Sequence, residues 1–136
     1  MVKAIVKDIL FLGQKSESAT KDDTQVAIDL MDTLNANADG CVGLAANMIG
    51  YKKCVIIFDD GGTYTVMFNP KIIKSSGKYE TEEGCLSLTG LRPTTRYKSI
   101  KVEFQDINFK PKIKTYKDFT AQIIQHEIDH CNGIII

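Results

Sequence analysis

Near the start of the chain, between Thr20 and Asn37, apolar positions recur every three or four residues in an otherwise polar stretch. The residues that follow this spacing are Val26, Ala27, Leu30, Met31 and Leu34. That interval places them on one face of a helix, and Thr20 or Asp22 has the side chain that an N-cap requires. We therefore predict one amphipathic helix over residues 20–37.

The middle of the chain follows a different pattern, in which β-branched residues cluster or apolar and polar residues alternate. Four runs have this pattern: CVIIFDD from Cys54, TYTVMFNP from Thr63, SIKVEFQDI from Ser99 and KPKIKTYKDF from Lys110. Gly, Pro, Asn and Asp residues bound these runs, as in the DDGG segment at residues 59–62. We predict antiparallel strands that are joined by short turns.

Helical character returns over residues 118–131. Phe119, Ile123 and Ile124 are apolar positions that support this prediction. Asp118 or Thr120 is a candidate N-cap, and Asn132-Gly133 has the composition of a helix stop. A helix, a set of strands and a late helix together indicate the α+β class.

Length and charge narrow the function classes. A chain of 136 residues with 43% hydrophobic content predicts one compact domain over residues 1–136. The formal net charge is zero, and no basic run suggests a nucleic-acid partner. Lys3, Lys7 and Asp8 interrupt the apolar residues of the amino terminus, which excludes a signal peptide or a membrane-spanning helix there. We expect a soluble, cytoplasmic protein without a membrane partner.

The cysteines show neither CxxC pairing nor the dense spacing of a disulfide scaffold. They are Cys41, Cys54, Cys85 and Cys131. In a reducing compartment, each is a buried apolar residue, a reactive thiol or a metal ligand.

The late helix carries the strongest chemical signal of the sequence, QHEIDHC at residues 125–131. The only two histidines of the chain, His126 and His130, are four residues apart, so they differ by about 40° around a helix axis. Glu127 lies beside that face, as in the HExxH arrangement of two metal ligands and a base. An ordinary polar turn of a helix is the alternative interpretation, because the motif is short.

A catalytic metal site of this type needs a third protein ligand. Only CNGIII follows His130 before the chain ends at Ile136, so the third ligand should lie upstream. The best candidate segment is EEGCLS at residues 82–87, where Cys85 stands among acidic and glycine residues.

Three segments resemble, in order and approximate spacing, the three motifs of the peptide deformylase family. They are GLAANMIG at residues 43–50, EGCLS at residues 83–87 and HEIDH at residues 126–130. The resemblance spans most of the chain and is to a short form that lacks a C-terminal extension. It implies antiparallel β-sheets around a central C-terminal helix that carries HEIDH. It also implies hydrolysis of the N-formyl group from the first methionine of newly made polypeptides, with release of formate.

The resemblance further implies a role for individual residues. Cys85, His126 and His130 would hold one divalent ion, ferrous iron in the family, with zinc, nickel or cobalt as alternatives. Glu127 would act as general base and then as acid, and the backbone N–H of Leu86 would donate to the formyl oxygen. The expected peptide contacts are Val42, Gly43, Phe119, Ile123 and Arg92. Asp129 either pairs with Arg96 or is a solvated helix charge. Formylated nascent chains are the implied partner, and the ribosome is a further candidate.

The first motif departs from the family pattern at two positions. Cys41 stands where the family has its first glycine, and Met48 stands where the family has a glutamine that donates to the oxyanion. A thioether cannot donate a hydrogen bond, and loss of one oxyanion donor typically costs ~10²–10³ in rate. Asn47 offers an amide one residue earlier, but its side chain should point in a different direction.

Three hypotheses about function therefore stay open. The first is a deformylase that Met48 weakens or re-tunes. The second is a metal hydrolase of another small N-acyl substrate, for which Met48 and the polar Gln122 would be the reason. The third is a non-catalytic metal-binding, peptide-binding or redox-sensing relative with Cys85 as its reactive atom.

Overall fold

The structure, a computed structural model, describes residues 1–135. Its elements in chain order are α1 (Ile9–Leu12), η1 (Lys21–Asp23), α2 (Thr24–Ala36), β1 (Gly43–Ala45), η2 (Ala46–Ile49), β2 (Val55–Asp60), β3 (Thr63–Cys85), β4 (Leu88–Gln105), β5 (Pro111–Lys117) and α3 (Asp118–Cys131). The strands form one antiparallel five-stranded sheet in the order β1-β2-β3-β4-β5. The α+β class is thereby confirmed.

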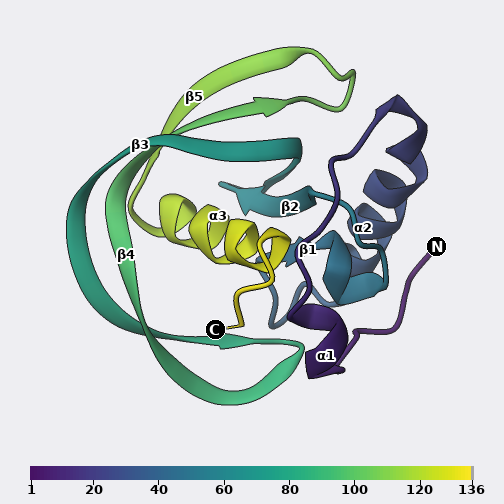
Figure 1. Ribbon diagram of the computed structural model, residues 1–136, viewed down its shortest axis with the longest axis horizontal. Helices are drawn as coiled ribbons and strands as arrows, with labels where there is room; N and C mark the ends of the chain where they lie inside the picture. Colours follow the sequence, from purple (N-terminus) through teal and green to yellow (C-terminus); the bar gives the residue numbers. More distant parts are fainter. Residues whose placement is uncertain (136) are drawn as a thin grey trace.

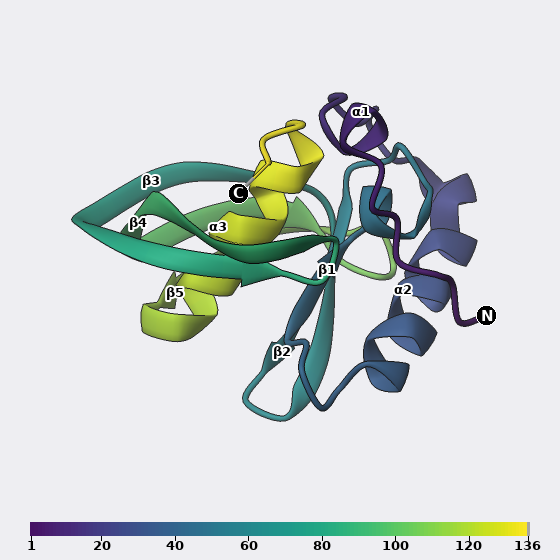
Figure 2. The same ribbon diagram turned by 90° about the horizontal axis from the view of Figure 1, so that it is seen from below.

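The sheet bends around the C-terminal helix. β3 and β4 form a long hairpin that curves around α3, and β5 leads directly into this helix (Figure 1). β1 and β2 lie between α2 and α3 (Figure 2), and both helices contact them. The pairing of β3 with β4 shifts register at Phe68/Lys71, Ile72/Lys74 and Glu83/Cys85. Such irregularities bend strands and re-aim side chains, and the last one lies directly beside Cys85.

The core fills the space on both sides of β2. Leu30 and Leu34 of α2, Ile56 and Phe58 of β2, and Ile124 of α3 are fully buried. α3 is unusual because its buried side also contains polar residues: Gln125, His126, Glu127 and His130. Buried polar groups on a helix are costly unless they have partners, so this helix must meet a polar site.

The predicted helices are present, but one predicted cap is wrong. Thr20 does cap a helical turn, since its side chain accepts a hydrogen bond from the Asp22 N–H at 3.3 Å. At α3, however, neither Asp118 nor Thr120 is the N-cap. Lys117 has that position, and Asp118 is the first helical residue, with a φ of 54°. The helix ends at Cys131 with Asn132 as its C-cap, which agrees with the predicted stop at Asn132-Gly133.

The predicted strands are also present, but β3 and β4 are much longer than their apolar runs. Both strands continue through residues that are mostly polar and exposed, as far as Cys85 in β3 and from Leu88 in β4. No helix among residues 1–135 has both the length and the apolar character needed to cross a membrane.

Candidate active site

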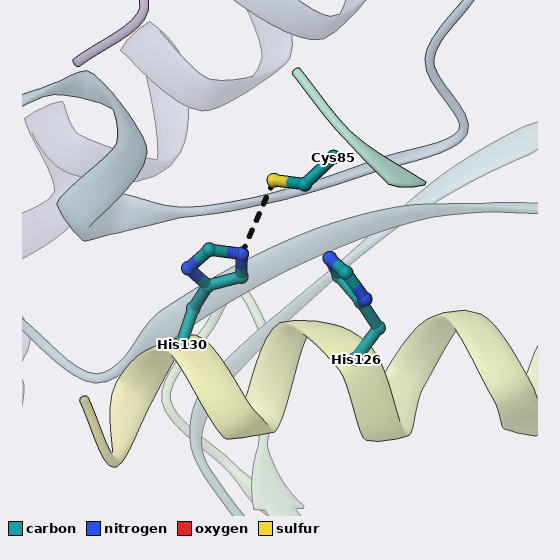
Figure 3. Close-up of side chains that lie close together, drawn as sticks. All are labelled: Cys85, His126 and His130. Carbon is teal, nitrogen blue, oxygen red and sulfur yellow. Dashed lines mark hydrogen bonds between the residues drawn. The ribbon is translucent and has the colours of Figure 1, made fainter. Parts of the chain in front are cut away.

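Two elements bring the three candidate metal ligands together. His126 and His130 lie one turn apart on α3, and Cys85 reaches them from the end of β3 (Figure 3). One possible ligand atom from each residue lies within 4.8 Å of the other two. The Cys85 Sγ is 3.4 Å from the His130 Nε2. Cys85 and His130, which are 45 positions apart in the sequence, thus share one site with His126.

The donor set fits a divalent transition ion. With Zn–S near 2.3 Å and Zn–N near 2.0–2.1 Å, a sulfur and a nitrogen that share a tetrahedral ion lie about 3.6 Å apart. The 3.4 Å between Cys85 Sγ and His130 Nε2 is close to that spacing. A thiolate and two imidazoles suit iron, zinc, cobalt or nickel, so the ligands alone do not select one metal.

A buried carboxylate orients the first histidine. The Nδ1–H of His126 donates to the Glu83 Oε1 at 2.8 Å. Arg96 holds the same carboxylate in a bidentate pair, with 2.9 Å from Nε to Oε2 and 2.6 Å from Nη2 to Oε1. Because Nδ1 is engaged, the Nε2 of His126 faces the site as a ligand atom. The expected pair of Asp129 and Arg96 is also present, with 2.7 Å between Oδ2 and Nη1.

Sequence reasoning had not assigned this role to Glu83. The signal that could have found it is its position two residues before Cys85, because an acidic residue so close to a candidate ligand can bond to another ligand of the same ion. Burial raises the pKa of Glu83, but its hydrogen bonds from His126, Arg96 and Gln122 more than offset this and lower the pKa to about 2. Glu83 is therefore ionised and can only accept hydrogen bonds.

The pKa values of three side chains on α3 are strongly shifted at this site. Burial lowers the pKa of His126, yet hydrogen bonds with Cys85 and Glu83 overcome that effect and raise it to about 10. Burial, together with the nearby His126 and Arg96 cations, lowers the pKa of His130 to about 4. Burial raises the pKa of Glu127 to about 7. A carboxyl group with a pKa near 7 can both accept and return a proton at neutral pH.

The carboxylate of Glu127 faces the site without a hydrogen-bond partner from the described part of the protein. Its side chain is buried, and its Oε1 has no hydrogen-bond partner among residues 1–135. It lines a cavity of about 510 Å³ together with Cys85 and His126. A buried carboxylate oxygen without a partner is costly, so a ligand or water in this cavity should complete its hydrogen bonding.

The same cavity contains most of the expected peptide contacts. Its walls include Val42, Gly43, Met48, Leu86, Phe119 and Ile123. Arg92 is not among the lining residues, and its Nη1 instead donates to the Thr89 carbonyl at 3.4 Å. Phe119 is 61% exposed, so it forms part of the cavity rim and not of the core.

Gly43 is placed where a side chain would collide with the site. A Cβ at this position would lie 2.7 Å from the Ile123 Cγ2 and 3.0 Å from the Glu127 Oε2. Both distances are far below a normal van der Waals contact. The absence of a side chain at Gly43 therefore lets the backbone of β1 approach the buried carboxylate.

The first motif contains no free side-chain amide that could serve as a donor in the cavity. Met48 is buried, and its Sδ accepts a hydrogen bond from the Ala45 N–H at 3.4 Å. The Asn47 amide points away from the cavity, because its Nδ2 donates to the His130 carbonyl at 2.9 Å. Asn47 thus supports the backbone of a metal ligand and does not replace the missing donor.

The remaining cysteines have different surroundings. Cys41 lines the cavity, and its thiol donates to the Gly43 carbonyl at 3.1 Å. Burial raises the pKa of Cys41 to about 11. Cys131 is buried, and neither it nor Cys54 forms a disulfide.

Comparisons with known proteins agree with this geometry. The model of the polypeptide deformylase family matches residues 5–136. A peptide deformylase from Clostridium beijerinckii is 60% identical over 136 residues, which cover 100% of both chains. Peptide deformylase 3 from Shewanella oneidensis is 40% identical over 109 residues, which are 77% of this chain and 66% of that protein.

Solved structures give the same result. The crystal structure of a peptide deformylase from Legionella pneumophila superposes with a TM-score of 0.88 at 34% identity and covers 99% of this chain and 83% of its own. A peptide deformylase from Acinetobacter baumannii with Met-Ala-Ser bound superposes with a TM-score of 0.84 at 29% identity. The superposition covers 99% of this chain and 97% of that chain.

Proposed function

Since this chain belongs to the polypeptide deformylase family, we propose that it hydrolyses the N-formyl group from the first methionine of newly made polypeptides, with Glu127 as the proton-transfer residue. One observation carries this proposal. The unpartnered Glu127 carboxylate lies in the same cavity as the ligands Cys85 and His126. A site that only binds metal has no need of such a carboxylate.

Cys85, His126 and His130 are the residues that hold the metal. A divalent ion in this site would polarise the formyl carbonyl and lower the pKa of a water molecule. By family resemblance, ferrous iron is the proposed ion, with zinc, nickel or cobalt as replacements that the same ligands suit.

Glu127 moves the proton during the reaction. It accepts a proton from the attacking water as the new C–O bond forms at the formyl carbon. It then returns that proton to the peptide nitrogen as the C–N bond breaks, which gives formate and a free amino terminus. A pKa of about 7 suits both steps at neutral pH.

The backbone N–H of Leu86 stabilises the negative charge that develops on the formyl oxygen. Met48, at the position of the family's side-chain donor, contributes no hydrogen bond to this oxygen. The reaction therefore proceeds with one donor fewer than in relatives that have a glutamine, and is slower for that reason.

The substrate peptide runs along β1. Gly43 lets its backbone approach Glu127, while Val42, Phe119 and Ile123 surround the first side chain. The Acinetobacter baumannii relative has Met-Ala-Ser bound, and the same peptide in formylated form is a suitable probe. The substrates in the cell would be formylated nascent chains in the cytoplasm, where the ribosome is the candidate partner.

The direct test compares wild-type protein with Glu127→Gln. Both are loaded with ferrous iron without oxygen, and formate release from formyl-Met-Ala-Ser is measured at known metal content. Glu127→Gln should keep its metal and lose roughly 10²–10⁴ in kcat. Glu103→Gln, which changes an exposed carboxylate on β4, is the matched control and should leave the rate unchanged. Equal rates for wild type and Glu127→Gln would overturn the proposal, as would a metal-loaded wild type that releases no formate.

A further inference from the structure

β1 presents a free backbone edge at the cavity. In an antiparallel pair, residues that exchange hydrogen bonds with the partner strand alternate with residues whose N–H and C=O point away from it. The Asp59 N–H of β2 donates to the Val42 carbonyl at 2.9 Å. Gly43, the next residue, lies opposite Phe58 and therefore directs its N–H and C=O away from β2. Gly43 lines the cavity and has no side chain, so its backbone faces this space.

Two sulfur-containing side chains of the first motif contact this edge. The Cys41 thiol donates to the Gly43 carbonyl at 3.1 Å. The N–H of Ala45, two residues further along β1 and directed to the same side, donates to the Met48 Sδ at 3.4 Å. Cys41 stands where the family has a glycine, which has no side-chain donor. The Gly43 carbonyl of this chain is thus engaged by a group that a glycine at this position would not supply.

The Cys41 thiol remains a hydrogen-bond donor at neutral pH. Burial raises its pKa to about 11, so the sulfur keeps its proton. An S–H group is a weaker donor than a peptide N–H. A peptide N–H can therefore replace the thiol at the Gly43 carbonyl with a net gain in hydrogen bonding.

A peptide that adds to β1 needs the same carbonyl. An extended peptide that joins a sheet edge bonds to the outward N–H and C=O groups of the edge strand. The peptide that runs along β1 in the proposed function, on which this step rests, would bring one of its N–H groups to the Gly43 carbonyl. Cys41 also lines the cavity, so its side chain stands in the space that the peptide enters.

We propose that the Cys41 thiol is a displaceable cap on the free edge of β1, which an N-formyl peptide must remove from the Gly43 carbonyl in order to bind. Cys41 thereby weakens peptide binding and raises KM. The chemical step is unaffected, because the thiol has already left the carbonyl in the enzyme–substrate complex.

The experiment measures KM and kcat for formyl-Met-Ala-Ser with iron-loaded wild type, Cys41→Ala and Cys41→Ser. Cys41→Ala removes the donor and should lower KM about two- to fivefold at unchanged kcat, the lower part of the range for a neutral hydrogen bond. Cys41→Ser places a stronger donor beside the carbonyl and should raise KM. Cys54→Ala is the matched control, because Cys54 does not line the cavity, and it should keep the wild-type KM.

The opposite directions of the two changes separate a cap from a structural role. If Cys41 only supported the backbone around β1, both substitutions would raise KM or lower kcat. That result would overturn the inference, as would wild-type KM values in both variants.

A binding measurement tests the cap without turnover. Infrared spectroscopy detects the S–H stretching bands of the metal-loaded protein, and the Cys41 band is the one that Cys41→Ala removes. Saturation with Met-Ala-Ser, the peptide bound in the Acinetobacter baumannii relative, should shift this band as the bond to Gly43 breaks. Wild-type S–H bands that the peptide leaves unchanged overturn the inference even where the variants do not fold. A shifted band in a protein that releases no formate overturns the proposed function alone.

Discussion

Replacing Met48 with glutamine should make the enzyme faster and less stable. Met48 lies within η2, is 1% exposed, and its Sδ accepts the Ala45 N–H. Glutamine is similar in length, so its Oε1 can take over this hydrogen bond. Its Nε2 is then a new donor at the wall of the cavity that Met48 lines.

The size of both effects follows from hydrogen-bond energetics. One oxyanion donor is typically worth ~10²–10³ in kcat, about 2.7–4 kcal/mol of transition-state stabilisation. In the free enzyme the same donor is buried without a protein partner, which costs about 1–3 kcal/mol of folding stability. Met48→Gln should therefore raise kcat by up to roughly this factor and lower the midpoint of unfolding.

The assay is formate release from formyl-Met-Ala-Ser at equal iron occupancy, with urea unfolding measured on the same preparations. Met48→Leu is the control, because it removes the sulfur and adds no donor. If Met48→Gln is folded, carries its metal and is no faster than Met48→Leu, the explanation of a missing oxyanion donor is wrong.

Three other changes test the site from different sides. In the metal-free protein the pKa of His126 is raised to about 10, so a metal ion must displace a proton from it. The metal affinity, measured by chelator competition, should therefore rise up to tenfold per pH unit between pH 7 and 9. An affinity that does not change with pH would contradict this. Glu83→Ala leaves the buried guanidinium of Arg96 and His126 without their shared partner. The free energy of unfolding, measured with urea, should fall by about 3–5 kcal/mol, and metal affinity should fall ~10–100-fold. Wild-type values for both would refute the assigned role. Gly43→Ala puts a Cβ 2.7 Å from the Ile123 Cγ2 and should lower kcat/KM by roughly 10², whereas Gly40→Ala, which meets nothing within 4 Å, should behave as wild type.

The local parts of the site could be read from the sequence because they depend on helix periodicity. His126, Glu127 and His130 lie within one stretch of α3, so their relative placement follows from 3.6 residues per turn. Cys85 is different, because no local rule relates a strand end to a helix that begins 33 residues later. Its segment was a candidate because too little chain follows His130, and its role as a ligand came from the resemblance of three segments to the motifs of the family. In the structure, Cys85 lies beside the two histidines.

Other features were missed because they depend on tertiary contacts. The parts of β3 and β4 that extend beyond their apolar runs have few apolar residues. These parts form strands because they pair with each other as they curve around α3. The role of Glu83 depends on Arg96 of β4, which is paired with Tyr79 in the sheet and reaches Glu83 only through its side chain, and on His126 from α3. The predicted cap at Asp118 was wrong because the chain passes from β5 directly into α3.

The most direct test of the whole account is a titration of metal-free protein with ferrous iron under anaerobic conditions, in which bound iron and formate release are measured on each sample. The site of Cys85, His126 and His130 predicts that the rate with formyl-Met-Ala-Ser rises in proportion to bound iron and stops rising at one equivalent. Binding of one equivalent without any release of formate would contradict the account.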